Sequence, residues 1–174
     1  MKELKDYVRT IPNFPKEGIM FRDVTTVLQN KDGLKMAIDA MQKDLENLDF
    51  DIIVAPESRG FIFGMPLAYN LNKAFVPIRK KGKLPYNTIE ESYDLEYGKA
   101  TLEVHVDSIK QGDKVVIVDD LIATGGTLEA IVKLVERLGG EVVKILCLME
   151  LPELKGRERL SKYNVSTNIL FEGE

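Results

Sequence analysis

Residues 115–127 read VVIVDDLIATGGT and predict a strand, a turn and the start of a helix. The run from Val115 to Val118 is β-branched throughout, which is typical of a strand buried on both faces in a parallel sheet. Asp119 and Asp120 follow at its carboxyl end. A helix is expected after the turn, because apolar side chains then recur at helical spacing, at Leu128, Ile131, Val132, Val135 and Leu138.

The turn between strand and helix has the composition of a phosphate site. It consists of small and hydroxyl-bearing residues, namely Ala123, Thr124, Gly125, Gly126 and Thr127. Backbone N–H groups at a helix start have no intrahelical partner, and glycine lets the chain approach an anion closely. Asp119 and Asp120 would repel a phosphate, so we expect them to face the vicinal hydroxyls of a ribose. The pattern therefore predicts a ribose 5-phosphate site; the alternative is an ordinary strand-to-helix turn with a solvated acid pair.

Strands and helices alternate along the chain, which predicts an α/β fold with an open, mostly parallel sheet flanked by helices. The turns after Ala55, Ile78 and Val118 should converge on one cleft, because ligands gather at the carboxyl ends of parallel strands. Pro66 should kink or delay the helix that follows the turn at residues 57–60. The expected elements are an amphipathic helix over 1–10, a helix over 33–48, a strand over 51–55 ended by Pro56, a helix from 60 to 71 and a strand over 74–78.

Residues 83–99, KLPYNTIEESYDLEYGK, show no clear period and form a longer connection than most in compact domains. We interpret this stretch as a mobile lid loop; a long solvated β-hairpin is the alternative. The basic run Arg79, Lys80, Lys81 and Lys83 comes just before it. Such a run is often a solvated turn, but beside a phosphate site its cations suit the remaining negative charge of the ligand.

Composition narrows the class of protein. A chain of 174 residues with 44% hydrophobic residues can bury a core as one domain. A net charge of −4 gives no reason to expect nucleic-acid binding. The single Cys147 and single His105 cannot supply a zinc site; we expect Cys147 in the core and His105 on the solvated face of a strand. No apolar run is long enough for a membrane span, so we expect a cytoplasmic protein.

The run 115–127 resembles the signature of type I phosphoribosyltransferases, and other stretches are similar to the adenine-specific members of that family. These stretches are 14–23, 57–61, 79–85, 92–99 and 154–158. The resemblance implies the family's fold: a single domain over 1–174 with a small hood from about 1–25 and 150–174, and a lid over about 83–99. It also implies transfer of a 5-phosphoribosyl group from phosphoribosyl pyrophosphate (PRPP) to adenine. The products would be AMP and pyrophosphate, as in purine salvage.

The resemblance further implies roles for individual residues. Asp119 and Asp120 would bind the ribose and stabilise positive charge at C1′, and Glu96 in the lid would be the acid–base group. The 5′-phosphate would bind at Ala123, Thr124, Gly125, Gly126 and Thr127, and the pyrophosphate at Ser58, Arg59, Arg79, Lys80 and Lys83. Adenine would lie between Phe21 and Leu151, with its edge read by the backbones of Met20 and Arg22. Phe21 and Leu151 could equally be core residues, and Glu96 a solvated charge.

No protein side chain is expected to ligate a metal directly, because Mg²⁺ would be held mostly by PRPP and water. A two-fold homodimer is expected from the family. Three other functions stay open: an enzyme for hypoxanthine, guanine or xanthine, a PRPP-sensing transcription regulator, and a nucleotide-binding scaffold without activity. The regulator would need a DNA-binding segment, and no helix-turn-helix spacing is evident.

Overall fold

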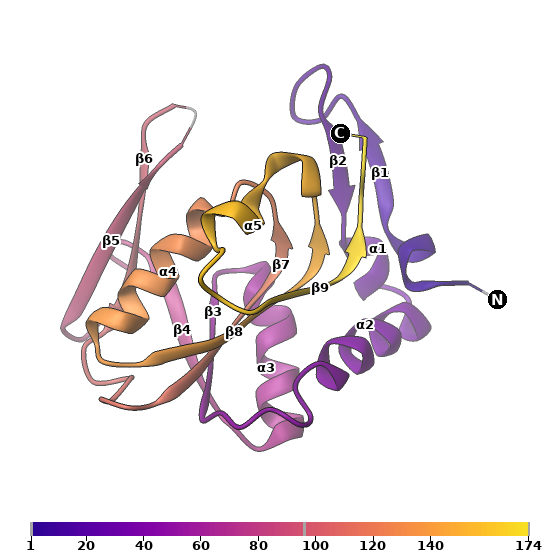
Figure 1. The fold of residues 1–174 in the computed structure, drawn as a ribbon. Helices are drawn as coiled ribbons and strands as arrows, with labels where there is room; N and C mark the ends of the chain where they lie inside the picture. The colour runs from indigo at the N-terminus through magenta and orange to yellow at the C-terminus, as the bar shows by residue number, and fades with distance from the viewer. Residues whose placement is uncertain (1, 96, 174) are drawn as a thin grey trace.

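The computed structural model describes residues 2–95 and 97–173, and its centre is a seven-stranded sheet (Figure 1). The strand order is β5-β6-β4-β3-β7-β8-β9. The five strands from β4 to β9 pair in parallel, and β6 and β5 add an antiparallel edge. The strands are β3 (Ile52–Pro56), β4 (Ala74–Lys80), β5 (Thr88–Asp94), β6 (Lys99–His105), β7 (Lys114–Ile122), β8 (Glu141–Glu150) and β9 (Val165–Leu170). The expected open, mostly parallel sheet is confirmed.

Helices cover both faces of this sheet, and the alternation of side chains along β7 shows why. Val116 and Val118 pack in one core cluster with residues of α2 (Lys31–Lys43) and α3 (Arg59–Leu71). Val115 and Ile117 point to the opposite face and pack with α4 (Gly126–Arg137). A strand between two helical layers must be apolar at every position, which explains its unbroken β-branched run.

Apart from the helix expected over residues 1–10, the predicted helices and strands are present with shifted ends. The helix expected over 33–48 is α2, which begins after Asn30 because that side chain accepts hydrogen bonds from the Asp32 and Gly33 amides at 2.9 and 3.1 Å. Helix α3 runs through Pro66 to Leu71. Strands β4 and β7 extend past their apolar runs into the charged residues that follow. These extensions carry the candidate site residues on regular backbone.

The amphipathic helix predicted for residues 1–10 is wrong. A short 3₁₀ helix, η1 (Leu4–Tyr7), is followed by strand β1 (Arg9–Pro12), which pairs antiparallel with β2 (Met20–Asp23). The β-branched Val8, Thr10 and Ile11 favour a strand, and the partner strand lies too far along the chain for helical periodicity to reveal it. Helix α1 (Thr25–Leu28) then connects this small sheet to α2.

Much of the stretch interpreted as a lid loop is half of a β-hairpin. Residues Thr88–Asp94 pair with Lys99–His105 over their whole length, so the alternative of a long hairpin describes this part correctly. Along β5, Ile89, Glu91 and Tyr93 are half-buried while the residues between them are exposed or less covered. Glu91 faces inward because its carboxylate accepts a hydrogen bond from Arg137 of α4 at 2.8 Å. Because the charged Glu91 occupies an inward position, the alternation of buried and exposed residues along β5 is not visible in the sequence.

The β5–β6 hairpin and the β1–β2 pair stand on opposite sides of α5 (Gly156–Arg159) in Figure 1. A 3₁₀ turn, η2 (Pro152–Leu154), leads from β8 to α5. Cys147 is buried as expected. His105 differs from expectation: its ring is half-buried, packs edge-on near Tyr86 and accepts a hydrogen bond from the Tyr86 amide at 3.3 Å. Within the described residues, no helix has the length and apolarity needed to cross a bilayer.

Candidate active site

The carboxyl ends of β3, β4 and β7 converge on one cleft, as predicted for the turns after Ala55, Ile78 and Val118. A smaller hollow of about 170 Å³ is lined by Glu57, Ser58 and Arg59 after β3, by Lys80 of β4, and by Asp119 and Asp120 of β7. A larger hollow of about 490 Å³ shares Arg59 and the two aspartates and continues along residues 123–128. Most of the candidate residues for ribose, phosphate and pyrophosphate therefore line two hollows that share residues.

The acid pair lies on the floor of both hollows. Asp120 is buried, and its amide donates a hydrogen bond to Asp119 Oδ1 at 2.8 Å. Arg59 Nε lies 3.0 Å from Asp120 Oδ2, but among the described residues this oxygen accepts no well-aligned hydrogen bond. Burial first, and then the neighbouring Asp120 charge, raise the pKa of Asp119 well above its ordinary value. Asp120 Oδ2 can therefore accept a hydrogen bond from a donor such as a ribose hydroxyl.

The turn after β7 has the backbone geometry that an anion site requires. Gly125 caps α4 with a φ of +87°, which only glycine adopts without strain. A Cβ at Gly125 would also lie 3.1 Å from the Gly156 carbonyl oxygen. Thr124, Gly126 and Thr127 line the larger hollow together with the acid pair. The first amides of α4 therefore lie at the same space as the carboxylates.

Glu57 organises the basic run, a role that we did not predict. Its carboxylate binds Arg79 Nε at 3.0 Å and Lys83 Nζ at 2.6 Å, and it accepts a hydrogen bond from the Lys80 amide at 2.9 Å. Burial alone would raise the pKa of Glu57, but these hydrogen bonds overcome it and lower the pKa to about 2. Arg59 and Lys80 line the cleft directly, whereas Arg79 and Lys83 are gathered beside it through Glu57. Glu57 lies 22 positions before Arg79, so no local pattern in the sequence indicated this pairing.

The residues expected to bind the base lie on other elements. Met20, Phe21 and Arg22 belong to β2, where Phe14 packs edge-on against Phe21 with ring centroids 5.1 Å apart. Leu151 is buried after β8, and its amide donates to the Ile122 carbonyl at 3.0 Å, next to the phosphate turn. Arg22 stacks over Phe171 at 4.5 Å, which attaches β2 to the segment after β9.

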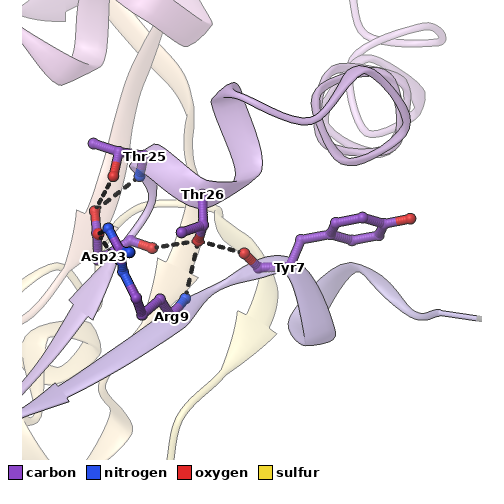
Figure 2. A network of polar contacts seen from close by, with 5 residues as sticks. All are labelled: Tyr7, Arg9, Asp23, Thr25 and Thr26. Atoms are coloured by element: carbon purple, nitrogen blue, oxygen red, sulfur yellow. Dashed lines mark hydrogen bonds and ion pairs between the residues drawn. The ribbon is translucent and has the colours of Figure 1, made fainter.

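A polar network fixes the end of β2 (Figure 2). Asp23 binds Arg9 of β1 with an Nη2–Oδ2 distance of 2.6 Å, and its other oxygen accepts from the Thr25 hydroxyl and amide at 2.6 and 2.9 Å. Thr26 bonds the Tyr7 carbonyl and accepts from the Arg9 amide. The Thr25 hydroxyl is the main cause that lowers the pKa of Asp23 to about 2, opposed by burial and aided by Arg9.

This network predicts acid sensitivity. Because the pKa of Asp23 is about 2 in the folded chain and 3.8 ordinarily, the unfolded chain binds the proton more readily. The stabilisation is complete above the ordinary pKa and is lost as the pH falls towards 2. In thermal unfolding from pH 6 to pH 2, Asp23→Asn should be less stable than wild type at pH 6 and converge with it at the acid end. Asp107→Asn, an exposed acid, should parallel wild type; a parallel curve for Asp23→Asn would contradict the pKa assignment.

Glu96, the expected acid–base residue, lies outside the described residues. Its neighbours do reach the cleft: Tyr93, Asp94 and Leu95 line the larger hollow. Beyond the turn, the Tyr97 ring lies 4.9 Å from Lys16 Nζ, so the tip of the β5–β6 hairpin meets the loop between β1 and β2. Tyr93 and Arg159 also line the cleft and were missed in the sequence. Tyr93 is signalled by its inward position on β5; nothing in the sequence placed Arg159.

Comparison with known proteins agrees with this geometry. The phosphoribosyl transferase domain profile matches residues 23–173. An adenine phosphoribosyltransferase of Lachnoclostridium phytofermentans is 68% identical over 174 residues, covering all of both chains. The crystal structure of adenine phosphoribosyltransferase from Thermoanaerobacter pseudethanolicus is 51% identical with a TM-score of 0.93, over 97% of this chain and 98% of that one.

A more distant structure adds ligands. The adenine phosphoribosyltransferase of Saccharomyces cerevisiae, 41% identical with a TM-score of 0.89 over 95% of this chain and 96% of that one, was solved with adenine and an imino-altritol bisphosphate. Identity at this level over whole chains shows common membership of a family. The chain belongs to the phosphoribosyl transferase domain family, and within it to the adenine phosphoribosyltransferases.

Proposed function

We propose that this chain transfers the 5-phosphoribosyl group of PRPP to adenine, giving AMP and pyrophosphate, at the cleft between β3, β4 and β7. One observation carries the proposal: the acid pair Asp119–Asp120 and the amides at the start of α4 line the same hollow. A ribose 5-phosphate carries hydroxyls that suit the acid pair and, at its other end, a phosphate that suits the amides of α4. The other bases and a scaffold role are disfavoured by relatives that are named for adenine over the full chain length.

The reaction forms a bond from N9 of adenine to C1′ as the bond from C1′ to the pyrophosphate oxygen breaks. Pyrophosphate leaves with the electron pair, and the N9 proton of adenine is released. Positive charge develops on the ribose ring, where Asp119 and Asp120 stabilise it. Arg59 and Lys80 line the cleft and neutralise the departing anion, with Arg79 and Lys83 gathered beside them by Glu57. Ser58, the N-cap residue of α3, completes the proposed pyrophosphate site.

Mg²⁺ fits this site as a companion of PRPP. Oxygen donors are what the ion prefers, and Asp120 Oδ2 accepts no aligned hydrogen bond among the described residues. Asp119 and Asp120 would hold the hydrated ion against the ligand oxygens. When bound, Mg²⁺ supplies positive charge to the pyrophosphate.

For the base, we propose the slot between Phe21 and Leu151, with the backbones of Met20 and Arg22 reading its edge. The Asp23 network supports this placement, because it fixes the end of strand β2, which carries Met20, Phe21 and Arg22. Adenine bound to the yeast relative is consistent with a base site of this kind.

The lone buried thiol of Cys147 suits a cytoplasmic enzyme.

We also propose Glu96 as the acid–base group of the lid. The contact between Lys16 and Tyr97 supports a hairpin tip that closes over the cleft. Glu96→Gln should lower kcat by about 10²–10⁴-fold with little change in PRPP affinity, because the proton is handled only in the chemical step. Steady-state kinetics beside Glu90→Gln, the same change at an exposed position of the hairpin, measures the difference. Equal losses would show that general lid charge matters rather than this carboxylate.

A homodimer is proposed from the exposed face of α3. Ile62, Met65 and Tyr69 recur at helical spacing and are 38, 51 and 83% exposed, more apolar surface than a solvated helix needs. An isologous contact would cover this face in both copies. Sedimentation should give twice the chain mass, and Tyr69→Lys should shift it towards the monomer.

The function itself is tested by incubating the protein with PRPP, Mg²⁺ and one purine at a time. Adenine should yield AMP and pyrophosphate in equal amounts. Nucleotide formed from hypoxanthine or guanine at a comparable rate would contradict the proposed base, and no nucleotide with any purine would contradict the reaction.

A further inference from the structure

Arg159 lines the larger hollow directly beside the proposed phosphate turn. It is the last residue of α5, and its side chain is 46% exposed. A Cβ built on Gly126 would lie 3.0 Å from Arg159 Nη1, so the guanidinium rests against the first residue of α4. Arg159 lines the same hollow as Thr124, Gly125 and the acid pair. A cation therefore lies where the phosphate of the ligand is expected.

The position of this cation is set by backbone packing. A Cβ on Gly156 would lie 2.5 Å from the Ala123 carbonyl oxygen, and one on Gly125 would lie 3.1 Å from the Gly156 oxygen. Only glycine at both positions lets α5 approach the turn so closely. Leu160, directly after Arg159, is buried in the core cluster that contains α4 residues. The backbone that carries Arg159 therefore packs against the turn at residues 123–127.

The guanidinium is also available for an anion. Among the described residues, its side chain makes no hydrogen bond, and its one ion pair is long, with Nε 4.0 Å from Glu129 Oε1. Both partners of that pair are more than a third exposed, so it contributes little. Guanidinium carries five donors in a planar fork that matches phosphate oxygens.

We propose that Arg159 is a further ligand of the 5′-phosphate, binding the oxygens that the backbone amides of α4 leave exposed. The inference rests on the proposed function, because it takes the turn at 123–127 as the phosphate site. Glu129 holds the guanidinium loosely until the phosphate replaces it. The role is one of binding: Arg159 should strengthen the affinity for ligands that carry the 5′-phosphate and leave the base site unchanged.

Calorimetry with AMP tests this on four proteins: wild type, Arg159→Ala, Arg159→Lys and Lys162→Ala, the last removing an exposed cation nearby. Arg159→Ala should weaken AMP binding by about 10- to 100-fold, the range for a charge-assisted contact. Arg159→Lys should lose less, since the charge remains without the fork. Lys162→Ala should stay within about twofold of wild type, in keeping with the small effect of surface charges.

Kinetics separates binding from a structural role. Arg159→Ala should raise the KM for PRPP while the KM for adenine at saturating PRPP, kcat and the ligand-free Tm stay near wild type. AMP binding within twofold of wild type, equal losses in Arg159→Ala and Lys162→Ala, or parallel changes in both KM values and Tm would each overturn the proposal. If Arg159→Ala does not fold, Arg159→Gln decides: it should weaken AMP binding because the charge is lost, and binding within twofold of wild type overturns the inference. Wild-type turnover tests the proposed function separately.

Discussion

Replacing both Asp119 and Asp120 with Asn should lower kcat/KM for PRPP by at least about 10²–10³-fold, the usual loss for an electrostatic contact made in the transition state. Asn keeps the shape of the side chains but removes the negative charge that opposes the developing charge at C1′. The two carboxylates line both hollows of the cleft, so no other pair of acids among the lining residues is placed to replace them. Steady-state kinetics measures the loss.

The same double variant should keep its fold, and its ligand-free Tm should equal or exceed that of wild type. Burial and the adjacent charge raise the pKa of Asp119, so ionising this carboxyl costs more free energy in the folded chain than in the unfolded chain. Neutral Asn removes that cost, a trade of stability against activity. Asp107→Asn serves as the control for loss of an acid elsewhere. Near-normal turnover of the double variant would mean that the pair is structural.

Gly125→Ala should abolish the protection that AMP gives against thermal unfolding. At a φ of +87° the added Cβ is strained, and it would press against the Gly156 oxygen at 3.1 Å. Relief of that contact moves either the turn or α5, and in both cases the amides that should hold the phosphate are displaced. Protection by a ligand depends on its affinity for the folded state, so Tm with and without saturating AMP reports the loss.

Gly112→Ala is the matched control for this variant. Gly112 has the same φ of +87°, but a Cβ there meets nothing within 4 Å. Both variants should lose about 1–2 kcal/mol of stability from the left-handed backbone. Only Gly125→Ala should also lose the AMP effect. If AMP raises the Tm of Gly125→Ala as much as that of wild type, the phosphate binds elsewhere.

The sequence predicted the centre of the fold because β7 and its turn are local features. A strand buried on two faces is recognisable from its unbroken apolar run, and parallel topology then brings the ends of β3, β4 and β7 together. The same reasoning failed for β1 and β5. In β1 the partner strand decides the structure, and in β5 the inward position of Glu91 depends on Arg137, 46 residues away. Neither dependence has a local signature.

Within the cleft, the residues near the ends of strands were predicted, but the residues that reach it through contacts between distant segments were not. Asp119 and Asp120 come directly after the apolar run of β7, and Arg59 comes shortly after β3, so their convergence followed from topology. Arg159 arrives through the contact between Gly125 and Gly156, two glycines 31 positions apart whose closeness no spacing rule reveals. Glu57 was included only in the stretch 57–61 and was given no role, although it binds Arg79 and Lys83. Side-chain pairing across strands requires the register, which the sequence does not contain.

The most direct test of the central claim, that the cleft at the ends of β3, β4 and β7 holds the phosphoribosyl group, is a crystal structure of the protein with AMP. The phosphate should lie against the backbone amides of residues 124–127, with both ribose hydroxyls donating to Asp119 and Asp120 and the base near Leu151. A phosphate bound instead at Ser58 and Arg59, or a ribose that does not contact the acid pair, would contradict the account.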